Sequence, residues 1–142
     1  MVKFVLDCSI AANWFVHNIN PEPDEYSKKV LFSLNSSSNV NAIVPHLWSY
    51  ELMNVMSLLE KNNICWQKIL NFLNLVETYA IQLNEDFALF PRELLELASQ
   101  YQLTGYDAAY LHLALHKGLP IATRDKKLMK AMQKAKISLL EA

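Results

Sequence analysis

The sequence predicts an α/β domain in which helices cover both faces of a mainly parallel sheet of about five strands. Two observations predict this class. Short, nearly continuous apolar runs recur along the chain, as expected of strands that are buried on both faces of a parallel sheet. Longer segments with helical spacing of apolar residues separate these runs, and such alternation implies crossover connections between parallel strands.

The expected elements alternate from the start of the chain. Residues 2–6 form the first apolar run, and helical spacing follows over residues 9–16 and 25–34. Further apolar runs predict strands over residues 42–44, 80–83, 119–122 and 137–140. Helical spacing predicts the remaining helices over residues 48–60, 66–78, 87–101, 106–116 and 126–135.

Proline and glycine residues fall at the boundaries of these elements. Pro45 follows the second expected strand, and Gly105 separates two expected helices. Gly118 and Pro120 end one helix before the fourth strand. In open α/β sheets, ligands bind beyond the carboxyl ends of the strands, so polar residues that follow a strand are candidates for a site.

Length and composition indicate one compact domain. A chain of 142 residues, 52% apolar and 19% charged, can bury a core without a disulfide or a structural metal, and we expect a single domain over residues 1–142. No apolar run approaches the roughly 20 residues that span a bilayer, and residues 1–3 lead into a strand pattern instead of a signal peptide. We therefore expect a cytosolic protein without a membrane segment, in which Cys8 and Cys65 are reduced thiols.

Charge is unevenly distributed along the chain. Residues 1–116 hold 6 basic and 12 acidic side chains, whereas residues 117–142 hold 7 basic and 2 acidic ones. Such a basic segment can bind the phosphates of a nucleic acid. The alternative is an ordinary solvated helix face.

Four acidic side chains interrupt or end apolar segments, namely Asp7, Glu51, Asp107 and Asp125. Each has a structural alternative: Asp7 in a turn or helix cap, Glu51 at a solvent-facing rim, Asp107 in a capping box with Thr104, and Asp125 as a helix cap. Gathered at one edge of a sheet, however, they would repel one another, since like charges about 4 Å apart cost on the order of 4 kcal/mol at an intermediate dielectric. Mg²⁺ or Mn²⁺ would relieve that repulsion.

Other chemistries have little support. His112 and His116 are four residues apart on an expected helix, but no Glu stands between them in the metalloprotease pattern, so zinc is the poorer candidate. His17 and His46 are isolated. The sequence contains no glycine-rich phosphate loop, no Ser/His/Asp arrangement and no redox pair of cysteines, which disfavours nucleotide binding and acyl transfer.

Four motifs, taken in order, resemble the PIN domain, and within it the VapC-type ribonuclease toxins of bacterial and archaeal toxin–antitoxin pairs. The resemblance runs nearly end to end. It rests on VLDCS at residues 5–9, VPHLW at 44–48 with ELMNV at 51–55, LTGYDAAYL at 103–111, and IATRDKKL at 121–128. Each motif alone is weak, and the four in order are specific.

The resemblance implies an endoribonuclease that depends on Mg²⁺ or Mn²⁺, forms a homodimer and is bound by a small antitoxin protein. It implies that the four acids form the metal and catalytic site, with Asp7 and Asp107 as direct ligands. It also implies supporting roles for Ser9, Asn54 and Thr123. Arg124 is larger and more basic than expected at its position, and it either contacts RNA phosphate together with Lys126 and Lys127 or points into solvent.

Two other functions remain open from the sequence. One is a catalytically silent domain that keeps the fold and serves as an RNA-binding or scaffold module, because a fold does not by itself confer activity. The other is a receiver- or flavodoxin-like module, whose acidic pocket at strand ends also binds Mg²⁺. In the second case Glu51 would have no evident role.

Overall fold

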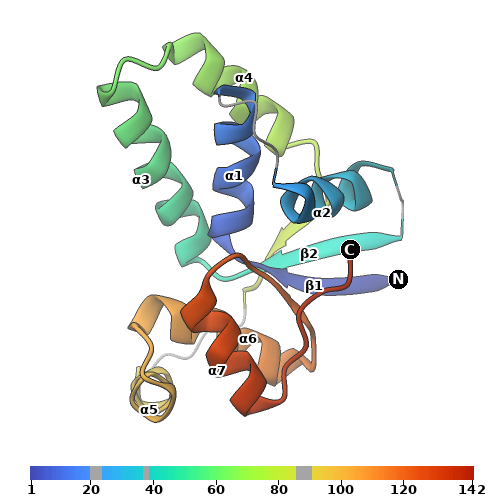
Figure 1. Cartoon of the computed structure of the whole chain (residues 1–142), viewed down its shortest axis with the longest axis vertical. Coiled ribbons are helices and arrows are strands. Elements are labelled where there is room, and N and C mark those ends of the chain that lie inside the picture. The colour runs from blue at the N-terminus through green and yellow to red at the C-terminus, as the bar shows by residue number, and fades with distance from the viewer. Residues whose placement is uncertain (20–23, 37–38, 86–90) are drawn as a thin grey trace.

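The centre of the molecule is a parallel sheet of four strands in the order β3-β2-β1-β4 (Figure 1). The computed structural model describes residues 1–19, 24–36, 39–85 and 91–142. The strands are β1 (Val2–Leu6), β2 (Val40–Val44), β3 (Ile81–Leu83) and β4 (Ile121–Ala122). β1 pairs with β2 on one side, where Phe4 lies opposite Ala42, and with β4 on the other, where Val5 lies opposite Ile121. The predicted parallel α/β fold is confirmed.

Seven helices are described around this sheet. They are α1 (Cys8–Ile19), α2 (Glu25–Ser36), α3 (Leu47–Lys61), α4 (Trp66–Val76), α5 (Arg92–Tyr101), α6 (Gly105–Lys117) and α7 (Lys126–Ala135). The chain steps from β1 to β2 to β3 in one direction and then returns past β1 to β4. Because such crossovers are right-handed, the reversal sends the later helices to the opposite face. Figure 1 shows α1 to α4 on one side of the sheet and α5 to α7 on the other.

The reversal of direction also decides where a site can form. It creates a topological switch point between β1 and β4, whose carboxyl ends lie side by side. Ligands of open α/β sheets bind in the crevice at such a point. Residues that directly follow β1 and β4 are therefore brought together, although they are far apart in the sequence.

Both layers of helices bury apolar side chains against the sheet. The last three residues of β1 are fully buried, which explains why this strand is continuously apolar. In the first layer, Phe15 of α1 packs against Phe72 of α4 with ring centroids 4.9 Å apart. In the second layer, Leu111 of α6 and Leu128 of α7 are fully buried. Each such side chain contributes roughly 1.5–3 kcal/mol to stability, and together they fix the strand ends that carry the site.

The fifth expected strand, residues 137–140, does not form a ladder. The segment lies beside β4, where Ile121 N donates to Ser138 O at 3.0 Å and Leu140 N donates to Ile121 O at 2.9 Å. This contact amounts to an isolated parallel bridge between Ile121 and Leu139, because β4 has only two residues to pair with. Among the described residues the sheet thus has four strands instead of about five.

Four further expectations can be compared with the described residues. Within the helix expected over residues 87–101, the structure has α5 at Arg92–Tyr101 with Pro91 as its N-cap, and residues 87–90 lie outside the described part of the chain. Gly118 ends α6 in the left-handed region at φ 64°, which a glycine adopts without strain. Cys8 and Cys65 are both free thiols, as expected. Among the described helices, none has the length and apolar character needed to cross a membrane.

Candidate active site

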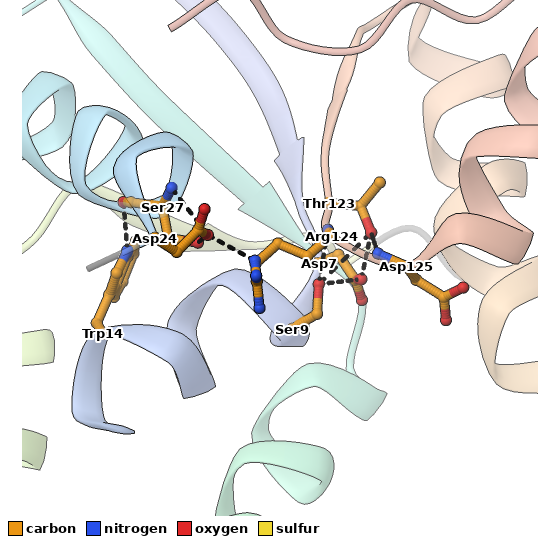
Figure 2. A network of polar contacts seen from close by, with 8 residues as sticks. All are labelled: Asp7, Ser9, Trp14, Asp24, Ser27, Thr123, Arg124 and Asp125. Carbon is orange, nitrogen blue, oxygen red and sulfur yellow. Dashed lines mark hydrogen bonds and ion pairs between the residues drawn. The ribbon is translucent and has the colours of Figure 1, made fainter. Parts of the chain in front are cut away.

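Asp7 directly follows β1 and is almost fully buried, with 5% of its surface exposed. Its Oδ2 accepts two hydroxyl hydrogen bonds, from Thr123 Oγ1 at 2.6 Å and from Ser9 Oγ at 2.7 Å. Thr123 directly follows β4, so the pairing of β1 with β4 brings its hydroxyl to Asp7. The two hydroxyls expected to support the site therefore both bind the same carboxylate oxygen (Figure 2).

The turn after β4 continues this network into α7. Asp125 N donates to Thr123 Oγ1 at 3.0 Å, and Arg124 N donates to Ser9 Oγ at 3.1 Å. Asp125 is also the N-cap of α7, because its Oδ1 accepts from Lys127 N at 2.8 Å and from Leu128 N at 3.2 Å. The capping alternative for Asp125 is thus observed. Capping through one oxygen orients the carboxylate and is compatible with a second role for the other oxygen.

Glu51 reaches the site from the first turns of α3 and is half-buried. Its Oε1 accepts a hydrogen bond of 2.6 Å from Tyr110 Oη, which comes from α6. Tyr110 is fully buried, and it was not among the residues that the sequence singled out for the site. Two features could have identified Tyr110 as a site residue. A buried tyrosine hydroxyl needs a hydrogen-bond partner, and Tyr110 stands one helical turn after Asp107.

Asp107 stands in the first turn of α6. Its backbone N–H donates to Thr104 Oγ1 at 3.1 Å, which is the N-cap half of the expected capping box. The capping alternative is therefore observed for the backbone of Asp107, as it is for the side chain of Asp125. The half-buried Asp107 carboxyl group still feels the charges of Asp7 and Asp125.

The four acidic side chains influence one another electrostatically. They are hereafter called the acidic cluster and comprise Asp7, Glu51, Asp107 and Asp125. Burial is the largest cause that raises the pKa of Asp7, and the charge of Asp125 raises it further. Burial likewise raises the pKa of Glu51, with the charges of Asp7 and Asp107 adding to the shift. The pKa of Asp107 is raised by burial and then by Asp125 and Asp7. Burial is the largest cause in each case, and a cation among these carboxylates would offset the smaller part of each shift that comes from the neighbouring negative charges.

The donor set suits a hard divalent cation, although the side chains are not arranged around one. Among the described residues, no three acidic, histidine or cysteine side chains stand in position to hold a metal ion together. Carboxylates and hydroxyl oxygens are nevertheless the ligands that Mg²⁺ and Mn²⁺ prefer. Cys8 adds no soft ligand, because burial and the charges of Glu51 and Asp7 raise the pKa of its thiol to about 12. The donor chemistry fits, and binding would require rotation of the more exposed carboxylates.

The sequence also predicted supporting or substrate-binding roles for Asn54, Arg124, Lys126 and Lys127. Asn54 is exposed on α3 and hydrogen-bonds none of the described acidic residues. Lys126 and Lys127 are exposed in the first turn of α7, and the charge of Lys127 lowers the pKa of Asp107. The Arg124 side chain turns away to form an ion pair with Asp24, with Nε 2.5 Å from Asp24 Oδ2. Sequence reasoning missed Asp24.

His112 and His116 make their contacts outside the acidic cluster. His112 Nε2 lies 2.8 Å from Glu93 Oε2, and its ring stacks on that of His116 with centroids 5.3 Å apart. The His112–Glu93 contact links α6 to α5 on the surface. The side chain of His17 lies outside the description.

The fold and the site together define a small α/β domain that gathers carboxylates from separate segments at the switch point of its parallel sheet. The chain belongs to the PIN domain family, whose family model matches residues 4–134. PIN domains are generally nucleases and generally use divalent metals. A comparison with curated proteins gave no match.

Solved structures share the fold. The chain is similar to PAE2754 from Pyrobaculum aerophilum, with 18% identity over 92% of this chain and 84% of that one and a TM-score of 0.63. It is similar to VapBC2 from Rickettsia felis, solved bound to a DNA fragment from its promoter, with 17% identity over 99% and 98% and a TM-score of 0.62. It is also similar to FitAcB from Neisseria gonorrhoeae, with 15% identity over 97% of this chain and 96% of that one and a TM-score of 0.58. At these identities the likeness concerns the fold.

Proposed function

We propose that the protein is an Mg²⁺- or Mn²⁺-dependent endoribonuclease and the toxin of a type II toxin–antitoxin pair. The observation that carries the nuclease proposal is the acidic cluster at the switch point between β1 and β4. Three of its carboxyl groups have pKa values that are raised by burial and further by the charges of other members of the cluster. Repulsion of this kind costs stability unless a cation offsets it. A receiver-like module would leave Glu51 and its bond from Tyr110 without a role.

In the proposed mechanism Asp7 and Asp107 are the direct metal ligands, with Glu51 and Asp125 completing the site. When bound, the cation would polarise a phosphoryl oxygen and lower the pKa of an attacking water. The protein's own contribution is to hold the ligands in place. Hydroxyls from Ser9 and Thr123 fix the buried carboxylate of Asp7, while Tyr110 fixes the carboxylate of Glu51. Such preorganisation reduces the reorganisation needed during the reaction.

Substrate binding is proposed for the basic segment that flanks the cluster. Lys126, Lys127, Lys130 and Lys134 are all exposed on α7, the helix that begins at Asp125. Together with Arg124 they would hold the RNA backbone beside the cleavage site, and this contribution should weaken as salt is raised. Asn54, exposed one turn after Glu51, would contact the substrate.

The biological setting is proposed from the resemblance to VapC-type toxins and from the fold shared with VapBC2 and FitAcB. In this setting the protein is cytosolic and dimeric, and a small antitoxin binds it and blocks the site. Co-expression with the product of an adjacent small reading frame would test the pairing. Relief of growth arrest and co-purification of the two proteins are the expected results.

The decisive test of the nuclease proposal is cleavage of an RNA oligonucleotide with Mn²⁺, with EDTA, and by the Asp7→Asn variant. Glu60→Gln is the matched control, because Glu60 is an exposed acid on α3 outside the cluster. Cleavage should be lost with EDTA and with Asp7→Asn and retained by the control. Activity that survives both treatments contradicts the mechanism, and metal-dependent RNA binding without cleavage supports the silent scaffold instead.

A further inference from the structure

Arg124 carries its charge beside the acidic cluster and not inside it. Its backbone N–H donates to Ser9 Oγ at 3.1 Å, and Ser9 Oγ donates in turn to Asp7 Oδ2 at 2.7 Å. The backbone of Arg124 is therefore only two hydrogen bonds away from a proposed metal ligand. Its side chain nevertheless points the other way, toward Asp24, as Figure 2 shows.

Asp24 is itself fixed by the packing of α1 and α2. It precedes α2, where its Oδ2 accepts from Ser27 N at 3.2 Å and also from Ser27 Oγ. Ser27 is buried, and its carbonyl oxygen accepts from Trp14 Nε1 of α1 at 2.8 Å. With 17% of its side chain exposed, the Asp24 carboxylate is held in one place, and so it determines where the guanidinium lies.

Stability does not account for this ion pair. The Asp24 side chain is only 17% exposed, but the Arg124 side chain is 46% exposed, so solvent screens the pair and its contribution to folding is small. Capping of α2 does not require it either, because asparagine or serine caps a helix as well as aspartate does. We therefore looked for the effect of the Arg124–Asp24 ion pair in where it places the positive charge of Arg124.

Released from Asp24, the guanidinium would be free to turn toward the cluster, because its backbone is linked through Ser9 to Asp7 and directly precedes Asp125. An arginine fork binds carboxylates through two parallel hydrogen bonds, and so it would occupy the oxygens that a cation needs and cancel the charge that attracts it. We propose that Asp24 is a positioning residue that holds the Arg124 guanidinium off the acidic cluster and so leaves the cluster free for a divalent cation. This inference rests on the proposed metal site.

A double-mutant cycle on the full chain tests the coupling between these two residues, with Mn²⁺ binding measured by titration calorimetry and by the metal-induced rise in Tm. Asp24→Asn should weaken Mn²⁺ binding about tenfold, equivalent to about 1.4 kcal/mol. Arg124→Gln should bind as tightly as the wild type or more tightly. The double variant should match Arg124→Gln, because no guanidinium remains to compete. Asp24→Ser gives the same comparison if Asp24→Asn folds poorly.

Glu25→Gln is the control for the loss of one negative charge at the same end of α2, since Glu25 is exposed and pairs with Lys28. It should leave Mn²⁺ affinity within about twofold of the wild type, in keeping with the weak effect of exposed charges. An equal loss of affinity on Asp24→Asn with and without Arg124 would overturn the inference, as would no loss at all. If the wild type shows no Asp7-dependent Mn²⁺ binding, the proposed metal site fails as well. Intact wild-type binding without coupling overturns the role of Asp24 alone.

Discussion

The hydroxyl of Thr123 links three parts of the site, and its removal should have a measurable cost. Thr123 is fully buried, donates to Asp7 Oδ2 at 2.6 Å and accepts from Asp125 N at 3.0 Å. Thr123→Val keeps the volume of the side chain and removes both hydrogen bonds. Thr123→Ser is the matched control, because it keeps the hydroxyl and loses one methyl group.

The expected magnitude follows from the two bonds. A hydrogen bond to a charged group contributes about 1.5–3 kcal/mol and a neutral one about 0.5–1.5 kcal/mol. Thr123→Val should therefore lower the free energy of unfolding by roughly 2–4 kcal/mol at a pH where Asp7 is ionised. Thr123→Ser should lose only about 1 kcal/mol, the value of one buried methyl group.

Urea unfolding of the metal-free protein measures these differences directly, with equal m-values as the check that both variants unfold in the same way. A pH series gives a second readout. The bond from Thr123 lowers the pKa of Asp7, so its loss should raise that pKa further and move Mn²⁺ binding to higher pH. A valine variant as stable as the serine variant, with unchanged pH dependence of binding, would refute the role given to this hydroxyl.

Three further outcomes are expected. Tyr110→Phe leaves the half-buried Glu51 carboxylate without its 2.6 Å bond and should cost about 1–3 kcal/mol in urea unfolding together with weaker Mn²⁺ binding, whereas unchanged binding would restrict Tyr110 to packing. The raised pKa of Asp7 means that the folded state binds more protons than the unfolded state. The stability of the metal-free protein should therefore fall as pH rises from about 4 through that pKa. In thermal unfolding scans, Asp7→Asn should flatten this fall. Combined replacement of Lys126 and Lys127 by glutamine should reduce the salt dependence of RNA binding by about 1.4 in log–log slope, measured by fluorescence anisotropy, and an unchanged slope would place the RNA elsewhere.

Local patterns in the sequence were sufficient to predict the fold class. The apolar run of β1 and the alternation of strands with helical segments indicated a parallel sheet, and the position of Asp7 after β1 indicated a strand-end site. The segment at 137–140 was wrongly expected to be a full strand. Its apolar run is a local property, whereas a ladder requires a partner, and β4 offers only two residues.

The parts of the site that could not be predicted depend on contacts between distant segments. Tyr110 has the sequence context of a core residue, and only the approach of α3 to α6 gives its hydroxyl a carboxylate partner. The pairing of Arg124 with Asp24 likewise depends on how α2 is placed beside the turn after β4. The Asp7 network was foreseeable in kind, because Ser9 and Thr123 flank the two strand ends, but not in its convergence on a single oxygen.

The central claim is that the acidic cluster binds a divalent cation, and the most direct test is anomalous diffraction from crystals soaked in Mn²⁺. An anomalous peak is expected between the carboxylates of Asp7 and Asp107, at about 2.0–2.2 Å from their oxygens, and it should disappear in Asp7→Asn crystals. A wild-type protein that cleaves RNA in a Mn²⁺-dependent manner but shows no peak within the acidic cluster would contradict the account.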